Sequence, residues 1–309
     1  MDLTANKKKN SNRMLRWSAS LLILIGYSLM IMPTAADIYS RIGQTATIIG
    51  YQDAVDSMTD EEIAEAKQKS IDYNQKIAEQ QASEFYHYSA TTDYDPEYLS
   101  LPVSGSTDMC TIVIRKINVN LPVGHGTTDE LLQSEPGHLY GTSLPVGGDS
   151  THTVVAAHSG LRSSEQFTRL DELQEGDYFD VVVLGEVHRY LIDQIVVCLP
   201  DECDQYLQVV PGKDYFTLYT CTPYGINTHR LLVRGHRIAD PVMNENTGAD
   251  SATVVTDRYK PVIEFALIII VPITLLIIAN IVASKHEAAA DRKNRSRKEG
   301  SVRGKNEDV

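Results

Sequence analysis

The chain has 309 residues, of which 42% are hydrophobic, 7% aromatic and 22% charged, and its formal net charge is −13. This length suits one domain of about 150 to 200 residues with accessory segments. The acid excess makes nucleic acid a poor partner, because phosphate backbones attract basic surfaces. The composition therefore argues against a nucleic-acid-binding function.

Residues 1–16 are basic, and residues 17–36 begin with the uncharged run WSASLLILIGYSLMIMP. A basic segment followed by such a run predicts a cytoplasmic N-terminus and a transmembrane helix or signal anchor over 17–36. The alternative is cleavage after the small-residue site Thr34-Ala35-Ala36.

Residues 37–90 show a helical pattern and are predicted to be an extracellular helical segment. The clearest helix begins at Thr59, which can cap it while Glu62 returns the bond. Packing residues then recur every three or four positions, at Ile63, Ala66, Ser70, Tyr73 and Ile77. This spacing predicts one packed face.

Residues 91–106 are rich in Tyr, Ser, Thr, Asp and Pro, and they are predicted to form a loop or linker. Residues 107–240 instead alternate turns with short β-rich runs: TIVIRKINVNLPV, HTVVAAH, YFDVVVLG, RYLIDQIVVCLP, YFTLYTC and RLLVRGHRI. Short strands without long helices between them predict a mainly β domain, a barrel or a sandwich.

Residues 241–261 are polar and are predicted to be a stalk. Residues 262–283 contain the run FALIIIVPITLLIIANIVA. At about 1.5 Å per residue, this run nearly crosses a hydrocarbon core of about 30 Å, which predicts a transmembrane helix. Residues 284–309 form a basic tail that is expected to be cytoplasmic.

Because both ends are basic, the positive-inside rule places both termini in the cytoplasm and the segment between the two spans outside the cell membrane. The charge distribution agrees with this division. Fifteen of the 28 basic residues but 35 of the 41 acidic residues lie between the tail and the basic N-terminus. The tail, rather than the acidic domain, is therefore the part that would contact anionic lipid.

The sequence has four cysteines, at Cys110, Cys198, Cys203 and Cys221. Cysteines outside the cell usually form disulfides, and Cys198 and Cys203 are close enough in sequence to form a small loop. Pairing of Cys110 with Cys221 is the alternative, and it would leave no nucleophile at position 221.

The stretch TLYTCTPYGINTHRLLVRG, residues 217–235, reads as strand, loop, strand. Cys221 lies at the mouth of the loop, and Arg230 begins the second strand. Pairing of the strands would bring the guanidinium near the thiol, which needs a base and an oxyanion donor to act as a nucleophile. His158 ends the small-residue strand TVVAAHSG and is the best-placed base, although a hydrogen-bonding role at the surface or in the core is the simpler alternative.

Other residues compete for roles at this site. Arg234 and Arg237 are rival oxyanion donors, and strand alternation places Arg234 on the face of Arg230 but farther from the cysteine. His229 is expected on the opposite face. A zinc site would use the set Cys221, His229 and His236. No CxxC or HxxxH spacing supports it, so no metal and no cofactor are expected.

The same stretch closely resembles the active-site strand pair of class C sortases, the pilin-polymerising transpeptidases of Gram-positive bacteria. Four further motifs lie in matching order, KINVNLPVGHGT, GHLYGTSLPVGG, STHTVVAAHSGL and GKDYFTLYTCTPYG. The resemblance covers about residues 110–238. The two predicted spans and the basic tail also look like the class C layout.

The resemblance implies an eight-stranded β-barrel with an N-terminal helical cap, flanked by two transmembrane helices. It implies that Cys221 attacks an LPxTG-like sorting signal and forms a thioacyl-enzyme, that His158 is the acid and base, and that Arg230 holds the oxyanion. The implied partners are pilins or surface proteins bearing this signal, together with an acceptor amine from a pilin lysine or a peptidoglycan precursor.

Class C sortases often carry a lid with Asp-Pro followed by an aromatic residue. Here Asp95-Pro96 is followed by Glu97, and aromatic rings stand at Tyr94 and Tyr98. The resemblance therefore implies a candidate lid in which Asp95 pairs with Arg230 and a tyrosine covers Cys221. A solvated linker is the alternative.

Two rival functions remain. One is a sortase that attaches surface proteins to peptidoglycan. The other is a non-catalytic surface receptor or adhesin, which predicts a β-domain held by disulfides with no free thiol.

Overall fold

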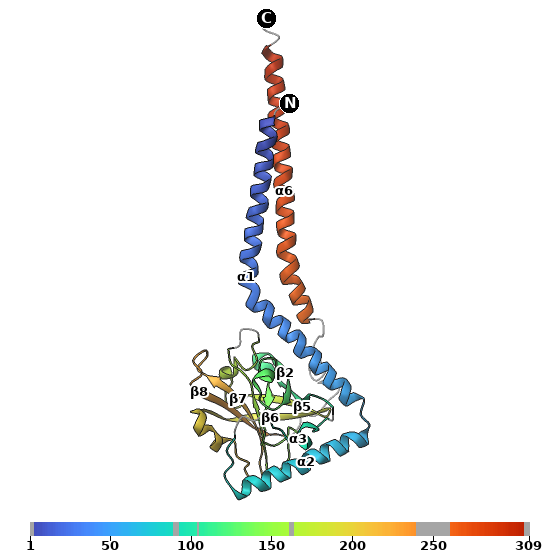
Figure 1. Ribbon diagram of the computed structural model, residues 1–309, viewed down its shortest axis with the longest axis vertical. Helices are drawn as coiled ribbons and strands as arrows, with labels where there is room; N and C mark the ends of the chain where they lie inside the picture. The colour runs from blue at the N-terminus through green and yellow to red at the C-terminus, as the bar shows by residue number, and fades with distance from the viewer. Residues whose placement is uncertain (1–2, 89–92, 104, 161–163, 239–259, 306–309) are drawn as a thin grey trace. The chain divides into compact units, whose positions relative to one another are not determined.

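The computed structural model describes residues 3–88, 93–103, 105–160, 164–238 and 260–305 (Figure 1). The chain divides into two compact units. One contains Met1–Ala35 together with Val262–Val309, and the other contains Ala36–Pro261. The predicted stalk over 241–261 lies almost entirely outside the described residues.

Two long helices precede the barrel, α1 (Leu3–Asp56) and α2 (Asp60–Ser83). The predicted capping box is present at the start of α2. The Glu62 carboxylate accepts from the Thr59 backbone N–H at 2.8 Å, and the Thr59 hydroxyl accepts from the Glu62 N–H at 3.2 Å. The buried face of α2 consists of Ser70, Tyr73, Asn74 and Ile77, which confirms the predicted packing face.

The barrel is closed and has eight strands, in the order β1-β2-β3-β4-β7-β8-β6-β5. This confirms the expected eight-stranded barrel over its sandwich alternative. The strands are β1 (Asp108–Ile114), β2 (Val119–His125), β3 (Gly137–His138), β4 (Thr151–Ala156), β5 (Tyr178–Val183), β6 (Glu186–Cys198), β7 (Asp214–Thr222) and β8 (His229–Arg237). The shorter helices are α3 (Pro96–Leu99), α4 (Asp129–Leu132), η1 (Arg115–Ile117), η2 (Leu170–Glu172) and η3 (Pro200–Tyr206).

Aliphatic and aromatic side chains from all sides of the barrel fill its interior, among them Ile112, Phe179, Phe216, Leu218 and Val233. Alternation along each strand sends every second side chain inward. The side chains between them point outward, and one part of this outer face carries the candidate site.

Helix α1 is fixed to the barrel by a buried tyrosine. The Tyr51 hydroxyl donates to the Met109 carbonyl at 2.9 Å and accepts from the Leu184 N–H at 3.1 Å. Asn74 of α2 binds both backbone groups of Leu144. These bonds satisfy backbone groups that would otherwise be buried without partners, so the part of α1 after Ala35, α2 and the barrel form one packed unit.

In the other unit, the first part of α1 lies beside α6 (Lys260–Lys305) (Figure 1). Met14–Asp56 and Val262–Ala290 are long and apolar enough to cross a membrane, by length and composition. Two polar contacts join the helices. The Tyr27 hydroxyl donates to the Ile268 carbonyl at 3.0 Å, and the Asn280 amide donates to the Ser20 hydroxyl at 3.0 Å.

Candidate active site

Cys221 and Arg230 are directly opposite each other in the antiparallel pair β7–β8. Opposite residues in such a pair project to the same face, with Cβ atoms about 5 Å apart. The next pair, Thr222 with His229, is the last one, so the loop between the two strands begins one residue after the cysteine. The structure therefore brings the thiol and the guanidinium together as the sequence predicts.

The parallel pairing of β4 with β7 places His158 beside the same point. Ala156, the last residue of β4, is paired with Tyr219, and the Ala157 N–H still donates to the Tyr219 carbonyl at 3.0 Å. His158 follows two residues after Ala156, and Cys221 follows two residues after Tyr219. The Thr220 hydroxyl donates to the Ala157 carbonyl at 2.8 Å and ties the two strand ends together. Thr220 thus has a local role, which is to hold the cysteine's strand against the histidine's.

The backbone around His158 is fixed, while one ring nitrogen is unused. The His158 N–H donates to the Gln166 side-chain oxygen at 3.0 Å, and the His158 carbonyl accepts from the Phe167 N–H at 3.2 Å. Within the described part of the chain, the His158 Nε2 atom is buried and has no hydrogen-bond partner. Buried polar atoms are normally paired, so an unpaired ring nitrogen beside a free thiol suits a group that exchanges protons with a substrate.

Two backbone carbonyls accept from the Arg230 guanidinium. It donates to the carbonyls of Asn227 and His229 at 3.0 Å each. Burial raises the pKa of Tyr219, and the charge of the nearby Arg230 lowers it in part. The arginine is therefore anchored at the level of Cys221.

The rival arginines are held elsewhere on the barrel. Arg234 is opposite Thr217, pairs with Asp193 at 3.0 Å and lies over the Tyr215 ring. Arg237 approaches Asp214 at 4.0 Å. Neither is level with the cysteine, so Arg230 is the donor that the geometry favours.

The zinc alternative does not fit the strand register. His229 is opposite Thr222, whereas His236 is opposite Tyr215, six residues before Cys221. At about 3.3 Å per residue, six residues span about 20 Å, too far for one ion. No group of three or more metal-ligating side chains is present among the residues that the structure describes.

The four cysteines divide into one disulfide and two thiols. Cys198 and Cys203 are bonded, while Cys110 is buried and free and Cys221 is partly exposed and free. Burial raises the pKa of the Cys110 thiol, and the charge of Asp108 raises it further. Cys110 is therefore an inert core residue, and Cys221 is the accessible thiol.

The candidate lid residues make other contacts than expected. Asp95 caps α3 by accepting from the Glu97 N–H at 2.8 Å, rather than pairing with Arg230. The Tyr94 hydroxyl accepts from the Thr127 N–H at 3.2 Å. Among the residues that the structure describes, no hydrogen bond or ion pair joins the candidate lid residues to Cys221, His158 or Arg230. The lid residues concerned are Tyr94, Asp95 and Tyr98.

Tyr98 is fully buried, and its hydroxyl is held there by hydrogen bonds. Its hydroxyl accepts from the Gly126 N–H at 2.9 Å and meets His138 Nδ1 at 3.0 Å, while His138 Nε2 meets the Ser143 carbonyl at 2.9 Å. Burial lowers the pKa of His138 to about 4, so the ring is neutral; Nε2 donates to the carbonyl and Nδ1 accepts from the tyrosine. Tyr98 is thus a buried structural link, because its hydroxyl completes this chain of hydrogen bonds.

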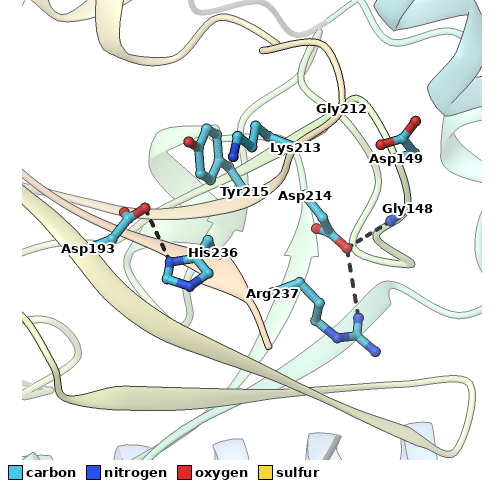
Figure 2. A pocket seen from close by; sticks show the side chains of 9 residues that line it. All are labelled: Gly148, Asp149, Asp193, Gly212, Lys213, Asp214, Tyr215, His236 and Arg237. Carbon is cyan, nitrogen blue, oxygen red and sulfur yellow. Dashed lines mark hydrogen bonds and ion pairs between the residues drawn. The ribbon is translucent and has the colours of Figure 1, made fainter. Parts of the chain in front are cut away.

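A separate cavity of about 590 Å³ lies at the other end of strands β7 and β8 (Figure 2). Several of its charged side chains bind one another or the backbone. His236 meets Asp193 at 3.2 Å, and Asp214 accepts from the Gly148 N–H at 2.9 Å and lies near Arg237. The residues that line it include no cysteine, so the partly exposed free thiol lies at the other end, with Cys221.

Two features of the site were not predicted from the sequence. Tyr219 lies one strand pair away from the Cys221–Arg230 pair, and η3 packs on the same face of the barrel through Cys203 and Leu207. Strand alternation could have placed Tyr219 on the face of Cys221, since the two residues are two positions apart. No local pattern indicates that η3 lies on that face.

Comparison with known proteins gives a consistent result. The family model of the sortase domain matches residues 112–238. Sortase C1 of GBS Pilus Island 1 is 39% identical over 63% of this chain and 98% of that chain, with a TM-score of 0.60. Sortase C1 from Streptococcus agalactiae is 43% identical over the same shares, with a TM-score of 0.58. Sortase C-1 from Actinomyces oris is 40% identical over 58% of this chain and 99% of that chain, with a TM-score of 0.53.

No curated protein sequence matches the chain. This chain, however, covers these three solved structures almost completely. Its sequence identity to them is well above the level at which only a fold is shared. Together with the closed barrel and its free thiol, they show that this chain belongs to the sortase family and, within it, to the class C sortases, which are cysteine transpeptidases.

Proposed function

We propose that this protein is a membrane-anchored transpeptidase that cleaves an LPxTG-like sorting signal through a thioacyl-enzyme and transfers it to a pilin lysine. The observation that carries the proposal is the pairing of Cys221 with Arg230 in β7–β8, with His158 two residues beyond the end of β4, the strand that pairs with β7. Nucleophile, base and oxyanion donor thus share one end of the barrel.

In the first half-reaction, the Cys221 thiolate attacks the carbonyl carbon that follows the threonine of the signal. Arg230 stabilises the oxyanion of the tetrahedral intermediate. The C–N bond breaks as protonated His158 gives its proton to the leaving amine, and a thioester remains on the cysteine. The unpaired His158 Nε2 supports this role.

In the second half-reaction, neutral His158 takes a proton from the incoming lysine amine. The amine attacks the thioester carbonyl, a new amide bond forms, and the C–S bond breaks to return the Cys221 thiolate. Water in place of the amine would give hydrolysis. A peptidoglycan stem-peptide amine would instead give cell-wall anchoring, which is the second candidate function.

The receptor or adhesin alternative predicts that no thiol is free. The structure pairs Cys198 with Cys203 and leaves Cys221 free and partly exposed. This arrangement favours an enzyme, because an accessible thiol beside an arginine has a chemical use but contributes little to the stability of a β-domain.

The proposal includes an orientation in the membrane. Both basic ends would lie in the cytoplasm, and residues 37–261 would lie outside the membrane. Two long apolar helices support the membrane association. The catalytic end of the barrel would then meet sorting signals on the outer surface.

The test uses the full chain in detergent micelles, an LPxTG peptide and a lysine-bearing acceptor peptide. Cys221→Ala should abolish both cleavage and ligation, and His158→Ala should be nearly as severe. Arg230→Lys should lower kcat/KM by about 10² to 10³, since an ammonium lacks the planar fork of a guanidinium. Product formation is followed by mass spectrometry.

Two matched controls make the test specific. Cys110→Ala removes a thiol from the core and should stay active. Arg234→Lys changes an arginine on the same strand face, which pairs with Asp193 instead, and should also stay active. An inactive Arg234→Lys beside an active Arg230→Lys would mean that the oxyanion donor is Arg234. Replacing the lysine peptide by a stem-peptide amine separates the two candidate acceptors.

A further inference from the structure

His158 lies just beyond the sheet, so contacts outside the sheet must fix its backbone. The residue before it, Ala157, still bonds to β7 through both backbone groups: its N–H donates to the Tyr219 carbonyl at 3.0 Å, and its carbonyl accepts from the Thr220 hydroxyl at 2.8 Å. The bonds to the His158 backbone come instead from residues 166 and 167. The place of the imidazole ring therefore depends on a segment that is not part of the barrel strands.

Three hydrogen bonds join the turn that begins at His158 to this segment. The Gln166 side-chain oxygen accepts from the His158 N–H at 3.0 Å, and the Phe167 N–H donates to the His158 carbonyl at 3.2 Å. The Thr168 hydroxyl accepts from the Gly160 N–H at 3.0 Å. Phe167 is fully buried in the barrel core, which fixes the second bond. The first bond depends on the Gln166 side chain alone.

Both ends of the Gln166 amide are used. The side chain is almost fully buried, and while its oxygen accepts from His158, its nitrogen donates to the Leu132 carbonyl at 3.0 Å. The amide thus joins the histidine backbone to the last residue of α4. A buried N–H that loses its acceptor is costly, so removal of this amide should let the His158 backbone move toward another partner.

The backbone of Gln166 is strained. Its φ is 29°, in the left-handed region that favours glycine. A residue with a side chain persists there only when its surroundings fix it, and strain of this kind gathers at functional sites. A glycine would relieve the strain but has no amide to bind the His158 N–H. The chain thus has a strained glutamine at the position where a side-chain acceptor is needed.

Helix α1 fixes the two residues before Gln166. The Gln44 amide donates to the Ser164 hydroxyl at 3.2 Å, and both of these side chains are almost fully buried. The Asp37 carboxylate accepts from the Glu165 N–H at 3.1 Å. Each residue from 164 to 166 therefore has a bond to a partner outside the segment, and the Gln166 amide is held at a defined point.

We propose that Gln166 is a positioning residue of the reaction: its side chain holds the His158 backbone at the place from which the imidazole delivers its proton to the leaving amine. This inference rests on the proposed function. In the step that it supports, the bond from the Cys221 sulfur to the carbonyl carbon forms, the C–N bond breaks, and the proton of His158 passes to the departing nitrogen. Gln166 contacts no reacting atom.

The test compares acyl-enzyme formation from two substrates, in single turnover, by the full chain in detergent. One substrate is the LPxTG peptide, and the other has a phenyl ester in place of the scissile amide, so its phenolate leaves without a proton. Gln166→Leu should acylate on the amide about tenfold more slowly, because a small displacement of the proton donor lowers the rate steeply. On the ester its rate should stay within about twofold of wild type. Mass spectrometry measures the acyl-enzyme.

A double-mutant cycle shows whether Gln166 acts through His158. In a protein that already carries His158→Ala, adding Gln166→Leu should cause no further loss on the amide, since the proton donor is absent. A further loss of about tenfold in that background would overturn the proposal. Equal losses on the amide and the ester, or an unchanged amide rate in the folded Gln166→Leu protein, would overturn it as well.

Asn74→Leu is the matched control. Asn74 is also almost fully buried, and its amide binds both backbone groups of a single residue, Leu144. This variant should unfold at a lower temperature but keep the wild-type ratio of the two acylation rates. A ratio that changes as it does in Gln166→Leu would count against the proposal, because any buried amide would then have the same effect.

Gln166→Gly keeps the test decisive if Gln166→Leu does not fold. Glycine suits the positive φ, so this variant should fold, and its missing side chain should reproduce the tenfold loss on the amide alone. A full amide rate in Gln166→Gly would refute the positioning role. Failure of the proposed function would look different, because the wild-type enzyme would then form no acyl-enzyme from the LPxTG peptide.

Discussion

At the scale of single residues, burial decides which ionisable groups take part in chemistry. Cys110 and Cys221 both carry a free thiol. Only Cys221 is partly exposed, and it lies opposite the positively charged Arg230. His152 is fully buried, meeting the Gln208 carbonyl at 2.9 Å and the Thr217 hydroxyl at 2.8 Å, and burial lowers its pKa to about 4. His158 keeps an unpaired nitrogen at the strand end instead.

Glu135 gives a prediction about pH. Burial, and then the charge of Asp108, raises the pKa of Glu135 to about 7. The folded state therefore favours the neutral acid, so this stabilisation is complete below about pH 4.5 and is lost as the pH rises through about 7. Glu135→Gln, which stays neutral, should raise the free energy of unfolding at pH 8 by about 1 to 2 kcal/mol.

Urea unfolding of both proteins at about pH 4 and pH 8 checks this expectation. At about pH 4 the side chain is mostly neutral in both the folded and the unfolded chain, so the two proteins should differ little. An equal difference at both pH values would show that the effect of the substitution comes from packing rather than from ionisation.

At the scale of elements, the sequence predicted what is encoded locally. The capping box at Thr59, the strand ending in Cys221 and the strand beginning at Arg230 follow from short patterns of residues, and all are present. The parallel pairing of β4 with β7 joins residues that are 63 positions apart. Periodicity carries no information about such partners. The pattern TVVAAHSG made His158 the best-placed candidate base, and the resemblance implied its role as acid and base.

The contacts of α3 could not be predicted from the sequence for a related reason. The segment around Asp95 has the polar composition of a loop, yet Tyr98 is buried because the Gly126 N–H and His138 satisfy its hydroxyl. Burial of a tyrosine depends on partners brought by other elements. The same holds for the Cys198–Cys203 bond, whose alternative partners were equally compatible with the spacing.

Helix α3 gives a prediction that tests the lid. Asp95→Ala removes the side chain that caps α3, so we expect a loss of stability of about 1 kcal/mol. Since Asp95 makes no bond to Arg230 in the described structure, the rate at which a small reagent alkylates Cys221 should stay unchanged. Faster alkylation, with thermal unfolding shifted only slightly, would support a lid. Ser100→Ala, at the other end of α3, is the control.

At the scale of the whole molecule, the chain combines a packed catalytic unit with a pair of apolar helices. Large apolar side chains of that pair are exposed, among them Leu22, Leu29, Leu267 and Leu275. Side chains of this kind suit a hydrocarbon environment. The bonds from Tyr27 and Asn280 satisfy polar groups between the helices, as interhelical hydrogen bonds do in membranes.

The orientation gives a prediction for intact cells. A protease added outside should cut within residues 37–261 and leave epitope tags at both termini uncut, because basic flanks are retained in the cytoplasm. Immunoblotting for each tag measures this. Permeabilised cells are the control, in which both tags should be lost. External loss of the C-terminal tag alone would contradict the two-span arrangement.

The bond from Thr220 to the Ala157 carbonyl also has a consequence for the timing of activity. The histidine and the cysteine that it brings together belong to strands whose pairing closes a long loop, and such non-local pairings form slowly. A newly synthesised chain thus carries its thiol before it carries a base for that thiol. The enzyme becomes competent only when the barrel closes, so turnover itself reports that folding is complete.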